Sequence, residues 1–147
     1  MAERTALAVL LLGALVTLGF MLHAGSPDRP LWWIGFLPFG AWGVLPFGLL
    51  AFSILARRGW MGGWLRGSAR GGPAASLLLV AAILLTGVST FLLYQAFIAE
   101  PDAQSGIVFV FLPIWQIVAM LPFILGAQSL RRRAARMAAD ADSRAGS

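Results

Sequence analysis

Four long apolar runs constrain this chain more than any other feature. The charged residues of the 147-residue sequence gather in short stretches, and none of the four runs contains Asp, Glu, Lys or Arg. A run of about 20 apolar residues can cross the hydrocarbon core of a bilayer as a helix. The pattern predicts an all-α integral membrane bundle of four transmembrane helices, at 5–24, 31–56, 73–98 and 106–130, followed by a basic tail at 131–147.

The composition leaves no room for a separate soluble domain. Apolar residues make up 59% of the chain and charged residues 12%, so we expect a single membrane domain. The first run could instead be a signal peptide, with Arg4 as its basic start, but it is long for that role. The sequence contains no cysteine, which excludes disulfides and thiol chemistry.

The distribution of arginine predicts the orientation. All 11 basic residues are arginine, and the segments before the first span, between the second and third, and after the fourth carry most of them. The two short turns at 25–30 and 99–105 hold three acids and one arginine. Because basic residues favour the cytoplasmic side, we expect both termini and the central loop to be cytoplasmic. Arg, Ala and Gly are encoded by GC-rich codons, and their use here suggests a bacterium with a GC-rich genome. We therefore expect the membrane to be a bacterial inner membrane.

The two halves of the sequence share an ordered set of matching residues, which suggests two tandem hairpins produced by internal duplication. The matches lie 74 to 76 positions apart. They pair Gly13 with Gly87, Pro27 with Pro101, Asp28 with Asp102, Pro38 with Pro113, Pro46 with Pro122 and Ser53 with Ser129. Chance reuse of Leu, Phe, Pro and Gly in membrane helices is the alternative. A duplication would relate the hairpins by a pseudo-twofold axis along the membrane normal.

Prolines in the second and fourth spans mark the candidate site. Each proline leaves a backbone carbonyl one turn earlier without its helical donor, and another group must meet that carbonyl inside a membrane. Gln116 must also find a partner on a neighbouring helix, and Tyr94 and Gln95 could join such a network. The candidate ligand or packing site comprises Pro38, Trp42, Pro46, Pro113, Trp115, Gln116 and Pro122. Packing without a ligand is the simpler interpretation.

Arginines beside the span ends predict contacts with anionic lipid headgroups rather than with nucleic acid. These candidates are Arg57, Arg58, Arg66, Arg70, Arg131, Arg132 and Arg133.

The polar residues do not form a recognisable catalytic or metal-binding motif. His23 is the only histidine, and its spacing from Asp28, Glu100 and Asp102 matches no metal-binding pattern. The spans contain no acidic or basic group of the kind that coupled transporters use. We therefore expect no enzyme activity and no cofactor.

The segment PDAQSGIVFVFLPIWQ, from Pro101 to Gln116, resembles small bacterial four-span membrane proteins of unknown function. The shared features are an acidic turn, Asp102-Ala103-Gln104, and an apolar run that ends in Pro113, Trp115 and Gln116. The resemblance covers mainly the second hairpin and implies four spans in a bacterial inner membrane. It transfers no activity and no functional residues. Small multidrug transporters are a poor match, because their membrane-buried glutamate is missing here.

The sequence favours a non-catalytic membrane component that packs against itself, a partner membrane protein or lipid. The first alternative is a small parallel-repeat transporter or channel for a neutral or lipophilic substrate, because helices interrupted by proline at corresponding positions of two repeats are typical of transporter sites. An enzyme or enzyme accessory that acts on lipid is the third interpretation.

Overall fold

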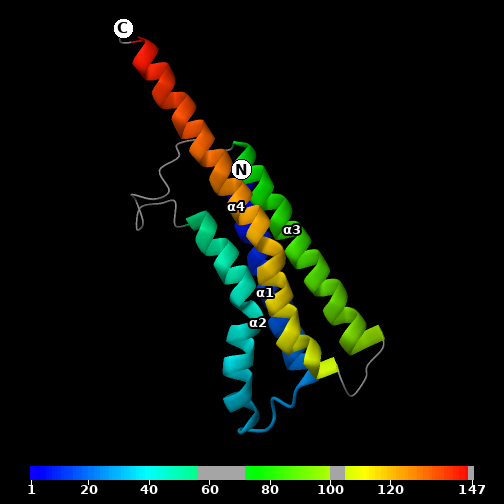
Figure 1. Ribbon diagram of the computed structural model, residues 1–147. Helices are drawn as coiled ribbons and strands as arrows, with labels where there is room; N and C mark the ends of the chain where they lie inside the picture. Colours follow the sequence, from blue (N-terminus) through cyan, green and yellow to red (C-terminus); the bar gives the residue numbers. More distant parts are fainter. Residues whose placement is uncertain (56–71, 100–104, 146–147) are drawn as a thin grey trace.

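The computed structural model contains four long helices, each apolar enough to cross a membrane, and describes residues 1–55, 72–99 and 105–145 (Figure 1). The elements are α1 (Ala2–Ala24), α2 (Trp32–Leu55), α3 (Pro73–Tyr94), a π-helical turn η2 (Gln95–Ala99) and α4 (Ser105–Ala145). The predicted all-α, four-span bundle is confirmed. The predictions for the central loop and for the acidic turn at 100–104 lie outside the described residues.

Aromatic side chains close the turn between α1 and α2. The Trp33 indole Nε1 donates a hydrogen bond to the Pro27 carbonyl at 3.1 Å. Trp32 lies against Gly25, where a Cβ atom would collide with the indole ring. Trp32, Trp33 and Phe36 also contact one another, with ring centroids 4.7 to 5.2 Å apart. The first turn of α2 is therefore fixed to the connection that precedes it.

The fourth helix continues far beyond the expected span. The sequence predicts a basic tail from 131 that frays after a turn or two, whereas α4 is helical to Ala145. The residues after Arg131 are mostly alanine and arginine, which have high helix propensity and favour continuing the helix. At 1.5 Å per residue, α4 is about 60 Å long. Figure 1 shows its last turns extending past the other helices.

The helices are arranged so that α1 and α4 lie diagonally opposite each other. Helix α1 packs against α2 and α3, and α4 packs against the same two helices. The start of α1 and the end of α4 lie at one end of the bundle, and the end of α1 and the starts of α2 and α4 lie at the other (Figure 1). We call these the terminal end and the turn end.

The packing gives no support to the predicted pseudo-twofold. A half-turn about an axis parallel to the helices exchanges α1 with α3 only when those two helices are diagonally opposed, yet here they are neighbours. The matched prolines also differ in environment. Pro113 is buried while its counterpart Pro38 is exposed, and Pro46 is buried while Pro122 is exposed. The two hairpins thus present different faces to the bundle interior.

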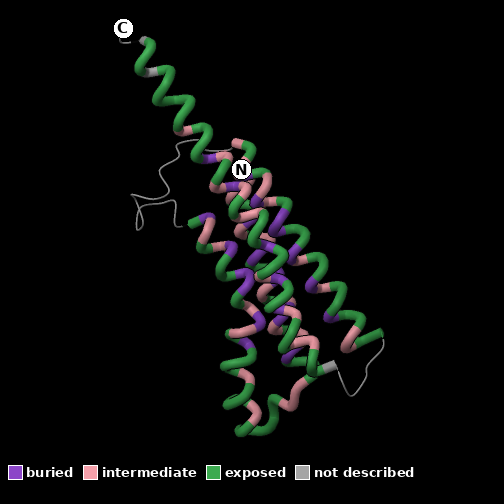
Figure 2. Tube along the Cα trace, viewed as in Figure 1, coloured by how far each residue is buried: buried purple, intermediate pink, exposed green. Residues whose placement is uncertain are grey.

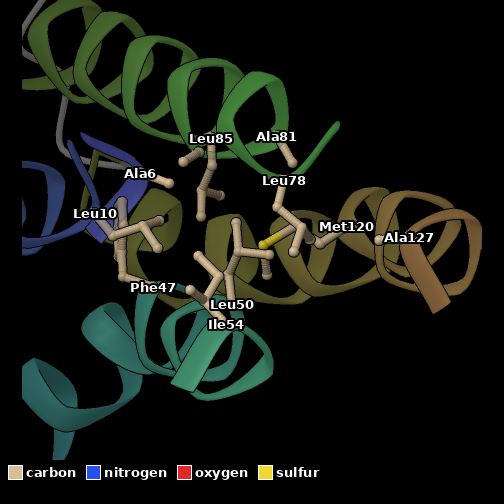
Figure 3. Packing of buried hydrophobic residues seen from close by; sticks show 11 residues of the cluster. Ala6, Leu10, Phe47, Leu50, Ile54, Leu78, Ala81, Leu85, Met120 and Ala127 are labelled. Carbon is tan, nitrogen blue, oxygen red and sulfur yellow. The ribbon is translucent and has the colours of Figure 1, made fainter. Parts of the chain in front are cut away.

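Figure 2 marks the buried residues along the helices, and Figure 3 shows the apolar core from close by. The core draws mainly on the first halves of α1 and α3 and the second half of α2, toward the terminal end. It comprises Ala6, Leu10, Phe47, Leu50, Ile54, Leu78, Ala81, Ala82, Leu85, Met120 and Ala127. The outward faces carry large apolar side chains as well, including Leu11, Leu37 and Leu125. In a bilayer both faces are apolar, so burial of apolar surface alone does not decide which helices meet. Close contacts and hydrogen bonds must provide that specificity.

Candidate functional site

A buried pair of polar side chains joins α3 to α4 near the middle of the bundle. The Gln116 Nε2 donates a hydrogen bond to the Ser89 Oγ at 2.6 Å. The Ser89 hydroxyl in turn donates to the Leu85 carbonyl in its own helix. Both side chains are buried, with 1% of Ser89 and 7% of Gln116 exposed. Gln116 is about 15 Å along α4 from the turn end, which places the pair near the centre of a bilayer.

One atom of this pair has no partner among the described residues. The Gln116 Oε1 is buried and accepts no hydrogen bond from the part of the chain that the structure describes. Amide oxygens in an apolar environment cost about 1–3 kcal/mol when they are left without a donor. Gln116 therefore has unused hydrogen-bonding capacity at the bundle interior.

A second polar contact joins α2 to α4 beside a proline. The Trp42 indole Nε1 donates to the Val110 carbonyl at 3.0 Å. Val110 lies one turn before the buried Pro113, whose missing N–H also removes the helical donor to the Phe109 carbonyl. The indole thus binds the helix backbone where proline has weakened its own hydrogen bonding.

Helix α1 contacts α3 through a hydrogen bond and α2 through glycines. The Thr86 Oγ1 donates to the Val9 carbonyl at 3.2 Å, which joins α3 to α1. On the other side, glycines allow α2 to approach closely. A Cβ at Gly40 would lie 3.3 Å from the Leu18 side chain, and one at Gly43 would lie 3.4 Å from Thr17. Each of the four larger helix interfaces therefore has its own polar or small-residue contact.

The predicted site residues divide into two groups. Trp42 and Gln116 make contacts between helices, and Pro46 and Pro113 are buried. Trp115, another member of the predicted site, is 68% exposed on the outer surface of α4. The structure also leaves Pro38 and Pro122 exposed.

The structure identifies Ser89 as the partner of Gln116, in place of Tyr94 or Gln95. Those two residues are exposed near the turn end, where α3 passes into η2. A signal for Ser89 was present in the sequence, because Leu85, Ser89 and Leu93 repeat every fourth residue on one helical face. A serine centred on such a face is a natural partner for a buried amide.

The arginines expected at lipid headgroups also differ from one another. Arg132 and Arg133 are exposed, whereas Arg131 is buried, with only 9% of its surface accessible. Arg57, Arg58, Arg66 and Arg70 lie outside the described residues.

The described residues do not form an acidic or metal-binding cluster. Within 1–55, 72–99 and 105–145, no group of three or more His, Cys, Asp or Glu side chains could hold a metal ion. His23 is exposed at the end of α1. The buried polar groups in the middle of the described spans are hydroxyls and one amide: Thr17, Ser89 and Gln116.

No protein-family model, curated protein or solved structure matches this chain. The chemistry of the site must therefore be judged from its own residues.

The Trp42 contact leads to a stability prediction. Trp42→Phe keeps an aromatic ring but removes the N–H that binds the Val110 carbonyl, and we expect it to lower the free energy of unfolding by about 0.6 kcal/mol, the average for hydrogen bonds between membrane helices. Denaturation with sodium dodecyl sulfate from mixed micelles measures this change. Trp115→Phe is the matched control, since Trp115 is exposed. Equal stability of the two variants would show that the indole hydrogen bond contributes nothing.

Proposed function

We propose that this protein is a non-catalytic component of a bacterial inner membrane that packs against a second copy, a partner membrane protein or lipid. The observation that carries the proposal is how the polar groups of the spans are used. Thr17, Thr86 and Trp42 each donate to a backbone carbonyl, and Ser89 and Gln116 bind each other. The bonds of Thr86, Trp42 and Gln116 join different helices, and the Thr17 bond lies within α1.

The chemistry of these groups supports a binding role over an enzymatic one. A hydroxyl becomes a nucleophile when a base removes its proton, and the described spans place no carboxylate or histidine beside Ser89 or Thr17. The large apolar side chains on all four outer faces suit contact with lipid or with other apolar helices.

Purification of the full chain in mild detergent, followed by native mass spectrometry, tests this function. We expect the protein to retain a second copy, a membrane protein or specific lipids in a fixed ratio. A purified protein that stays monomeric and free of lipid, and that converts a small molecule on its own, would contradict the proposal.

The proposed orientation places both termini and the central loop in the cytoplasm, on the evidence of the arginine distribution. Because the chain has no cysteine, single cysteines report on sidedness without a background signal. We expect cysteines at Ser26 and Gln104 to react with an impermeant thiol reagent added outside intact cells. Cysteines at Ser68 and Ser143 should react with the reagent only after the cells are lysed. Labelling of a cysteine at Ser143 from outside intact cells would show that the orientation is the reverse of the proposed one.

Exposed arginines where α4 leaves the bundle support contact with anionic lipid. Arg132 and Arg133 are exposed and directly follow the apolar part of α4, at the depth where headgroup phosphates would lie. The double variant Arg132→Ala/Arg133→Ala is expected to retain less phosphatidylglycerol in native mass spectra. Arg144→Ala is the control, since Arg144 lies about 17 Å further along the helix. Equal lipid retention in both variants would argue against headgroup binding here.

A further inference from the structure

We propose that Gln116 and Ser89 form a binding site inside the bilayer for a single neutral hydroxyl group, supplied by water or by an apolar alcohol. The hydroxyl donates to the Gln116 Oε1, the buried acceptor that receives no donor from the described residues. This binding role goes beyond the packing function, because a purely structural pair would need no outside molecule.

Four donors of the described spans, three hydroxyls and one indole, are already committed to backbone carbonyls. Ser89 donates to the Leu85 carbonyl, Thr17 to the Gly13 carbonyl and Thr86 to the Val9 carbonyl. The Trp42 indole donates to the Val110 carbonyl. Redirecting any of these donors to Gln116 would give up an existing hydrogen bond, with no net gain. An external donor satisfies Gln116 without breaking an existing contact.

The surroundings of the pair select a neutral ligand. Leu85 and Leu93 lie one turn on either side of Ser89, and Pro113 and Met120 flank Gln116 in the same way. All four are buried. A charged ligand would lose its hydration in this apolar setting without an opposite charge to compensate. A protonated amine or a carboxylate is therefore excluded in favour of an uncharged group.

A hydroxyl fits the site better than other uncharged groups. It is small enough to meet one buried amide atom, and it both donates and accepts hydrogen bonds. It can therefore donate to the Gln116 Oε1, or accept from the Nε2 if the amide is turned over. Water and long-chain alcohols both carry this group, but only the alcohol has an apolar chain attached to it. An experiment that responds to the apolar chain can therefore tell them apart.

Solid-state NMR on the full chain in phosphatidylcholine bilayers tests the proposal, because this lipid carries no hydroxyl. The chain has four glutamines, but Trp115–Gln116 is its only Trp-Gln pair, so paired isotope labelling assigns the Gln116 signals without a variant. If water is the donor, magnetisation should pass from water protons to the Gln116 side-chain carbonyl, as it does to the exposed Gln95. Buried Met120 should receive none.

If an alcohol is the donor, water transfer should be absent, and adding 1-decanol should shift the Gln116 carbonyl signal to a saturating value. Decane is the matched control, because it has the same apolar body without the hydroxyl, and should cause no shift. Thr90→Val, which removes the hydroxyl next to Ser89, should leave the Gln116 signals unchanged. The proposal is overturned if neither water nor 1-decanol reaches Gln116, or if Thr90→Val alters its signals and so identifies an internal donor.

Discussion

Replacing Gly13 by alanine is expected to lower the free energy of unfolding by about 1–3 kcal/mol, the range for overpacking a filled interior. Gly13 lies where α1 meets two other helices. A Cβ atom there would collide with the Phe47 ring of α2 and would lie 2.6 Å from the Thr86 Oγ1 of α3. Phe47 is buried in the core, and moving Thr86 would break its bond to Val9. Neither neighbour can give way without a cost.

Gly19→Ala is the matched control for this experiment. It adds the same methyl group to the same helix, at a position where a Cβ would meet nothing within 4 Å. We expect its free energy of unfolding, measured in mixed detergent micelles, to stay close to that of the natural chain. If the two alanine variants proved equally stable, the close three-helix contact at Gly13 would be refuted.

Ser89→Ala is expected to destabilise the bundle more than Gln116→Leu does. Loss of the Ser89 hydroxyl leaves the buried Gln116 amide without its described partner, at a cost of about 1–3 kcal/mol. Gln116→Leu removes the amide altogether, and Ser89 keeps its bond to the Leu85 carbonyl. An apolar group of similar shape at Gln116 should therefore change stability little.

The double variant makes this comparison decisive. Adding Gln116→Leu to Ser89→Ala removes the unpartnered amide, so we expect it to recover most of the lost stability. A double-mutant cycle of unfolding free energies measures the coupling between the two residues. Additive effects, with the double variant less stable than either single variant, would mean that the two side chains do not depend on each other.

The sequence alone was enough to predict the fold class, because the signal for a membrane span depends on length and charge and not on packing. The expected start of α3 at Pro73 matches the structure, since proline suits the first turn of a helix. The end of α4 was harder to place. Arginine was interpreted as the start of a fraying tail, but alanine and arginine also continue a helix well. Charged residues indicate where a helix leaves the membrane, but they do not indicate where the helix itself ends.

The candidate site was predicted only in part, for a related reason. Proline and glutamine were chosen because lipid cannot supply the hydrogen bonds that a proline-freed carbonyl or a glutamine side chain requires. Pro113, Gln116 and Trp42 do lie at helix contacts. Which side of a helix faces inward was not predictable, because lipid-facing and buried residues are equally apolar in this chain. Trp115 and Gln116 are adjacent in sequence, yet one is exposed and the other buried.

The neighbour relationship between α1 and α3 is the central structural claim, because it decides which polar contacts can form. Cysteines at Val9 and Thr86 test it most directly, since the Thr86 hydroxyl contacts the Val9 carbonyl. A short bifunctional thiol reagent, applied to native membranes, should cross-link this pair. It should fail with cysteines at Val9 and Gly87, where a side chain would face open space. Cross-linking of the second pair in place of the first would contradict the arrangement described here.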